Sequence, residues 1–207
     1  MVGRVERGEL GRIPYSALEA IANSLDGRLA LDFRWRGESL DRLIDEVHAG
    51  LVDQVVRLFR DARWDVHVEV SFSVYGERGS IDVFASHSPT RRGAVVEVKG
   101  SVPDAGNTVI GVDRKSRLAP KIARDRGWPC EGVARFLVAL DNSTSRDRIA
   151  RHADIFRTAF PAGGRESLAW IRDPVGPPPS GIIFLSPRRE RSRRSTARNA
   201  RRVITAR

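Results

Sequence analysis

Residues 66–74, with the sequence VHVEVSFSV, alternate without a break between apolar and polar side chains. Because successive side chains of a β-strand point to opposite faces, this period predicts a strand with one apolar and one polar face. The apolar face would hold Val66, Val68, Val70, Phe72 and Val74, and the polar face His67, Glu69, Ser71 and Ser73. Two more short strands are predicted at 80–85 and 94–99, after the turn YGERG and the loop SHSPTRRG. Such close spacing predicts an antiparallel meander.

Helical patterns surround this meander. Apolar side chains recur at intervals of three and four in stretches that predict helices, at 38–63, 112–126 and 144–159. Residues 133–140 are almost wholly apolar and predict a strand buried on both faces, and residues 181–185 predict a last strand. The order helix, three strands, helix, strand, helix, strand predicts an α/β fold with a mixed sheet flanked by helices. Residues 160–180 show no clear pattern.

The composition is that of a globular protein with an apolar core. The chain has 207 residues, of which 41% are hydrophobic and 30% charged, and no apolar run is long enough to cross a bilayer. Cys130 is its only cysteine, which excludes an intrachain disulfide and a cysteine-based zinc site. We therefore expect one main domain with appendages, a cytoplasmic location and no membrane partner.

The positive charge is concentrated at one end of the sequence. Residues 186–207 hold nine arginines and one glutamate, a net charge of +8 out of the chain's +10. This composition predicts a disordered tail that attracts polyanions such as DNA, with Arg188 and Arg189 as candidate contacts. A tail that only improves solubility is the alternative interpretation.

Three charged residues on the predicted meander suggest chemistry. Asp82 and Glu97 fall on the second and third strands, and Lys99 follows Glu97 by two positions. If these strands pair, both carboxylates reach one spot, and Glu97 and Lys99 project from the same face. Two carboxylates with a backbone carbonyl suit Mg²⁺, and a neighbouring lysine suits the orientation of a metal-bound water. A salt-bridge cluster on a solvated sheet face is the alternative.

The segments GSID at 79–82 and VVEVK at 95–99 resemble the two motifs of the PD-(D/E)xK nuclease superfamily. The resemblance covers about residues 38–140 and includes the order αβββαβ, although Ile81 stands where the motif has proline. It implies a restriction-endonuclease-like core and Mg²⁺- or Mn²⁺-dependent hydrolysis of DNA phosphodiester bonds. Asp82, Glu97 and the carbonyl of Val98 would hold the metal, and Lys99 would assist the attacking water. A metal-free relic of the fold is the alternative.

The same resemblance suggests further site residues. Glu69, on the polar face of the first strand, is a candidate third acid for the metal, and an exposed strand residue is the alternative. Arg78 in the first turn and Arg114 and Lys115 on the basic second helix are candidate DNA contacts, with solvated surface positions as the alternative. Enzymes of this type often act as dimers, so a homodimer is a possible state. The sequence has no phosphate-binding GxxxxGK[ST] or GxGxxG loop, so we expect no nucleotide cofactor.

The N-terminal residues carry a second resemblance. Val5-Glu6-Arg7-Gly8 and Ala22-Asn23-Ser24-Leu25 are similar to the end of a repressor-type helix-turn-helix domain of the xenobiotic-response-element family. A plain N-terminal helical hairpin is the alternative. The predicted organisation is therefore a helix-turn-helix remnant at 1–29, a nuclease-like domain at 30–185 and an Arg-rich tail at 186–207. A DNA-binding regulator that uses a nuclease-like fold without catalysis is the rival to the enzyme.

Overall fold

The computed structural model describes residues 3, 13–27, 38–102 and 104–186. The chain divides into two compact units, Met1–Leu40 and Asp41–Arg207. In the first unit, helix α2 spans Tyr15–Ser24 and buries none of its residues, and Leu25 beyond it is 76% exposed. The segment Val5-Glu6-Arg7-Gly8 and the tail arginines Arg188 and Arg189 lie outside the described residues.

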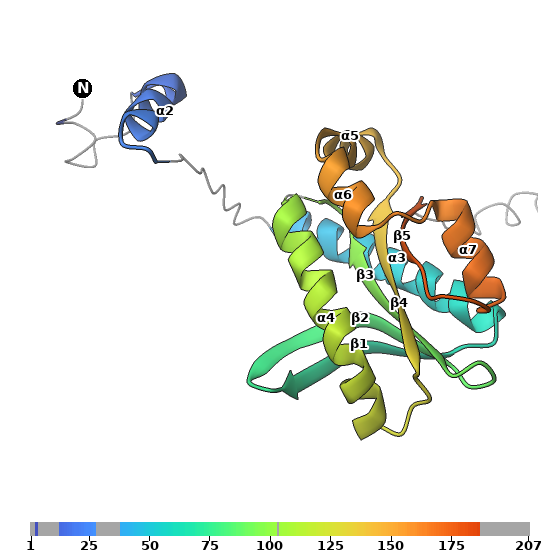
Figure 1. Ribbon diagram of the computed structural model, residues 1–207. Coiled ribbons are helices and arrows are strands. Elements are labelled where there is room, and N and C mark those ends of the chain that lie inside the picture. The colour runs from blue at the N-terminus through green and yellow to red at the C-terminus, as the bar shows by residue number, and fades with distance from the viewer. Residues whose placement is uncertain (1–2, 4–12, 28–37, 103, 187–207) are drawn as a thin grey trace, which may run out of the picture. The chain divides into compact units, whose positions relative to one another are not determined.

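The second unit is built on a five-stranded sheet in the order β1-β2-β3-β4-β5 (Figure 1). The strands are β1 (Asp65–Val74), β2 (Glu77–His87), β3 (Arg92–Lys99), β4 (Gly132–Leu140) and β5 (Ser180–Leu185). Strands β1, β2 and β3 are antiparallel neighbours, whereas β3, β4 and β5 run parallel. The predicted α/β class, mixed sheet and antiparallel meander are confirmed.

Helices cover both faces of the sheet. Helices α3 (Glu38–Asp61) and α7 (Gly164–Arg172) pack on one face through a cluster that includes Leu51, Phe59 and Trp170. Helices α4 (Ala105–Asp125), α5 (Ser143–Arg151) and α6 (Ala153–Ala159) cover the other face, where Leu118 and Phe156 are buried. Successive side chains of β3 and β4 pack against the helices on opposite faces of the sheet, because side chains alternate along a strand. No described helix combines the length and the apolar character that a membrane span requires.

Three helical segments differ from the prediction. Helix α4 starts at Ala105 rather than 112, because the side chain of Asp104 accepts a 2.8 Å hydrogen bond from the Asn107 amide and caps the helix. Two glycines in its first turns had hidden the helical pattern. The stretch 144–159 forms two helices, α5 and α6, that meet at His152. The unassigned stretch 160–180 contains α7.

The prediction of a single apolar face on β1 is wrong. Val66 packs with the α3 side of the sheet and Val70 with the α4 side, while Val68 between them is 51% exposed. Val68 pairs with Val83 and Val70 pairs with Ile81, but Glu69 between them has a φ of 49°. This left-handed residue turns the strand over, so the outer half of the β1–β2 hairpin faces α4.

Candidate functional site

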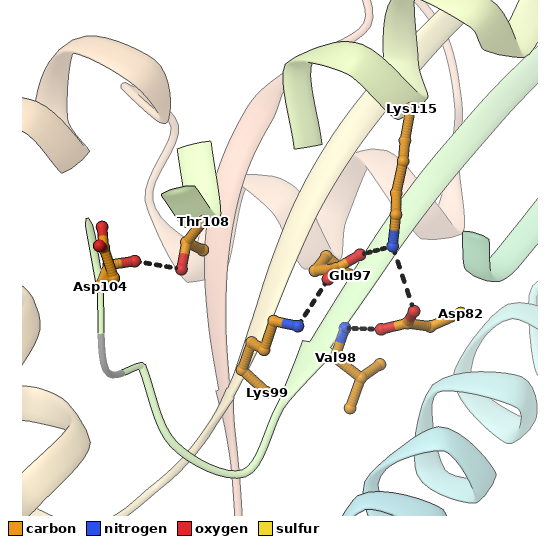
Figure 2. A network of polar contacts seen from close by, with 7 residues as sticks. All are labelled: Asp82, Glu97, Val98, Lys99, Asp104, Thr108 and Lys115. Atoms are coloured by element: carbon orange, nitrogen blue, oxygen red, sulfur yellow. Dashed lines mark hydrogen bonds and ion pairs between the residues drawn. The ribbon is translucent and has the colours of Figure 1, made fainter. Parts of the chain in front are cut away.

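The pairing of β2 with β3 brings Asp82 and Glu97 together. Both residues lie one position beyond the last paired residues, Val83 and Val96. The backbone amide of Val98 donates a 2.7 Å hydrogen bond to Oδ2 of Asp82, which ties the aspartate to the neighbouring strand (Figure 2). The structure therefore brings the two predicted carboxylates to one place on the sheet.

Two lysines bond these carboxylates. Lys99 Nζ lies 2.8 Å from Oε1 of Glu97. The two residues are two positions apart in β3, so their side chains share one face of the strand. Lys115 reaches in from α4, and its ammonium bonds Oε2 of Glu97 and lies 3.3 Å from Oδ1 of Asp82. Each of the four carboxylate oxygens therefore has a hydrogen-bond donor. We call Asp82, Glu97, Lys99 and Lys115 the ionic site.

Lys115 enters the site because it lies on the apolar face of α4. It is three residues after Val112 and three before Leu118, both of which are buried, and residues at this spacing share one face of a helix. The sequence predicted Lys115 as a DNA contact, whereas the structure places its ammonium between the buried Glu97 and the partly buried Asp82. A charged residue in register with an apolar helical stripe was the signal that could have revealed this role.

The ionic site is buried at one end and open at the other. The side chains of Glu97 and Lys115 are 8% and 10% exposed, whereas that of Lys99 is 36% exposed. Burial and the nearby charge of Glu97 raise the pKa of Asp82, against the lowering effects of Lys115, the Val98 amide and Lys99. Burial acts to lower the pKa of Lys99, but its hydrogen bond to Glu97 and the negative charges of Glu97 and Asp82 raise it overall. Lys99 therefore stays an ammonium at neutral pH, on the accessible side of the site.

The two carboxylates fit a divalent cation in part. Oδ1 of Asp82 and Oε2 of Glu97 point at a common cation, since the Lys115 ammonium contacts both, and carboxylate oxygens are ligands for Mg²⁺ and Mn²⁺. Among the described residues, no three His, Cys, Asp or Glu side chains are grouped to hold a metal. A cation here would need water, substrate or backbone oxygens to complete its shell.

Glu69 does not join the two carboxylates. Its side chain is exposed, and its Oε2 accepts a 3.3 Å hydrogen bond from the Ser80 hydroxyl on β2. The left-handed φ of Glu69 falls where the β1–β2 ladder is interrupted, beside the position of Asp82. Backbone strain of this kind is often found near functional sites.

The candidate DNA contacts that the structure describes lie at the surface. Arg78 is exposed on β2, four residues before Asp82, a separation of about 13 Å along a strand. Arg114 is exposed on α4 next to Lys115, and with Arg117 and Arg135 it lines a surface cavity of about 650 Å³. Neither Arg78 nor Arg114 contacts the ionic site through any described hydrogen bond or ion pair. Both side chains therefore lie outside the ionic site.

Comparison of the sequence with protein-family models and with curated proteins gives no match. The function is therefore inferred from the ionic site and its surroundings.

Proposed function

We propose that the protein is a metal-dependent endonuclease of the PD-(D/E)xK type that hydrolyses DNA phosphodiester bonds. The observation that supports this most is that Asp82 and Glu97 both bond one cationic group, the Lys115 ammonium. The Lys99 ammonium also bonds Glu97. These residues come from adjacent strands that follow a long helix, and the chain then continues through α4 to a parallel strand. This order matches the αβββαβ arrangement that the sequence motifs suggested.

In this proposal Asp82 and Glu97 hold Mg²⁺ or Mn²⁺, with the Val98 carbonyl as a further ligand. The ion would supply charge stabilisation at the phosphate and a nucleophilic water. Lys99 is the most exposed member of the ionic site, so its ammonium is available to donate hydrogen bonds to the attacking water or to a phosphate oxygen. The hydrogen bond from the Val98 amide holds Asp82 in place during this chemistry.

DNA would approach from the open side of the ionic site. Lys99 supplies positive charge there, and the exposed Arg78 on β2 and Arg114 on α4 are further candidate contacts. The arginines at 186–207 would add affinity that depends on salt rather than on sequence. Contacts between these cationic side chains and DNA phosphates would hold the DNA backbone in place without selecting a base sequence. A homodimer would let two such sites cut both strands.

A second candidate function is a DNA-binding regulator without catalysis. One observation favours it, because two ammonium groups already balance the two carboxylates of the ionic site. A cluster that is neutral without a metal can be purely structural. The likeness of Ala22-Asn23-Ser24-Leu25 to the end of a helix-turn-helix domain agrees with this candidate.

Cleavage of supercoiled plasmid at low salt with Mn²⁺ tests the proposal. We expect the wild type to nick or linearise the plasmid, and Asp82→Asn and Lys99→Met to lose activity by about 100-fold or more. Matched controls are Asp125→Asn and Lys121→Met on α4, since these residues form a separate surface ion pair and should cut like the wild type. Equal cutting by all variants would identify a contaminant. Retarded but uncut plasmid would favour the regulator.

A further inference from the structure

Lys115 is the member of the ionic site that the proposed hydrolysis does not use. Its side chain is 10% exposed, and the ammonium bonds one oxygen of Glu97 and one of Asp82. The other oxygens of these carboxylates are bound by Lys99 and by the Val98 amide. The two oxygens that a bridging cation would use are therefore the two that Lys115 occupies.

Charge balance explains why the Lys115 ammonium lies between Asp82 and Glu97 in the metal-free protein. The carboxylates of the buried Glu97 and the partly buried Asp82 repel each other, and a carboxylate without a partner is costly to bury. With Lys99 and Lys115 the ionic site is neutral, whereas without Lys115 it carries one uncompensated negative charge. Lys115 is therefore the internal cation that allows Asp82 and Glu97 to lie together.

The same balance makes Lys115 and a divalent cation mutually exclusive on these oxygens. A divalent ion added to the intact ionic site would leave it with two excess positive charges, and like charges at contact distance repel strongly at a buried position. The lysine side chain has four flexible methylene groups, so its ammonium can leave while α4 stays packed.

We propose that Lys115 is a built-in counter-ion that closes the metal-free site, and that a divalent cation binds by displacing its ammonium from Asp82 and Glu97. This inference rests on the proposed function, because it concerns the same metal site. The apparent metal affinity of the wild type is then lower than that of the open site, by the fraction of molecules in which Lys115 has moved away.

Titration calorimetry with Mn²⁺ tests the displacement directly on the full chain. Lys115→Met keeps the length of the side chain and removes its charge, and Lys121→Met, at the surface of α4, is the matched control. We expect Lys115→Met to bind Mn²⁺ about tenfold more tightly than the wild type or tighter still, and Lys121→Met to bind like the wild type. Equal or weaker binding by Lys115→Met overturns the proposal.

Thermal unfolding in EDTA gives a readout that does not need activity. We expect Lys115→Met to melt roughly 5–20 °C below the wild type, because one carboxylate loses its partner, and Mn²⁺ to raise its Tm more than that of the wild type. If Lys115→Met does not fold without metal, adding Asp82→Asn should restore folding in EDTA, since it removes the excess charge. A double variant no more stable than Lys115→Met overturns the counter-ion role.

The nuclease activity and the displacement of Lys115 can be tested separately. A wild type that binds Mn²⁺ and cuts DNA, with no tighter binding by Lys115→Met, overturns the counter-ion and leaves the nuclease standing. A wild type and a Lys115→Met variant that both fail to bind Mn²⁺, with no cutting, overturn the proposed function and the displacement together. If Lys115→Met binds Mn²⁺ tightly and the wild type does not, the displacement is supported even where the wild type cuts no DNA.

Discussion

The backbone amide of Val98 donates a 2.7 Å hydrogen bond to Oδ2 of Asp82. This bond links the main chain of β3 to a side chain of β2 and leaves Oδ1 of Asp82 to face Lys115. Asp82 therefore has two roles, since it satisfies a strand amide and also supplies an oxygen to the ionic site. The two roles can be separated by choosing the substitution.

Asp82→Asn and Asp82→Ala should differ in stability and agree in activity. Asparagine keeps an oxygen that accepts the Val98 hydrogen bond, whereas alanine leaves that amide without its acceptor, which costs about 1–3 kcal/mol. We expect the free energy of unfolding in urea to be lower for the alanine variant by about that amount, with plasmid cleavage lost in both. Equal stability would show that the Val98 bond contributes nothing to the fold.

Removal of residues 187–207 should weaken DNA binding in a way that depends on salt. The arginines of this segment would release counter-ions from DNA, so we expect the plot of log affinity against log salt to lose several units of slope without them. Fluorescence anisotropy of a labelled duplex between about 50 and 200 mM salt measures this slope. Replacing the arginines of 187–207 by lysines is the control and should keep the slope. An unchanged slope in the truncated protein would contradict a role for the tail in DNA binding.

Glu69→Gly should preserve or raise stability, against the usual effect of glycine in a strand. Glu69 has a φ of 49°, which costs a side-chain-bearing residue about 1 kcal/mol and costs glycine almost nothing. Ser71→Gly, at a neighbouring exposed position of β1 without a positive φ, is the control and should lose about 0.5–1 kcal/mol. Chemical denaturation of both variants checks the difference in sign. Equal losses would show that the backbone at Glu69 is relaxed.

Cys130 should react slowly with alkylating reagents. Burial raises its pKa from an ordinary value of 9.0 to about 11, and its Sγ packs against Gly93, where an added Cβ would lie only 2.6 Å away. At pH 8 this shift cuts the thiolate fraction, and so the rate with iodoacetamide, by about 100-fold. The rate should rise as pH increases towards 11, and the denatured protein should react like a free thiol. Fast reaction of the folded protein at pH 8 would contradict the burial.

Much of the fold follows from local pattern. The period of two around Glu97 and Lys99 predicted correctly that their side chains share a face, where they form an ion pair. The apolar stretch 133–140 predicted the buried strand β4. Short turns between three strands predicted the antiparallel meander. These features depend on the geometry of one strand or one hairpin, which neighbouring residues determine.

The parts that could not be predicted depend on packing between distant elements. Alternation along β1 was regular in the sequence, but the left-handed φ at Glu69 sends Val66 and Val70 to opposite layers. Lys115 belongs to a basic helix, and only the docking of α4 on the sheet shows that its ammonium reaches Asp82. The spacing of Lys115 from Val112 and Leu118 indicates that it faces the core, but it does not identify the carboxylates that its ammonium bonds.

The ionic site is assembled from one short stretch of chain. Its polar contacts join residues no more than 33 positions apart, from Asp82 on β2 to Lys115 on α4. Low sequence separation lowers the entropy lost on closing the intervening loop and favours early formation. The charged groups of this protein can therefore meet while the chain is still folding, before the residues that form α7 and β5 have joined the sheet.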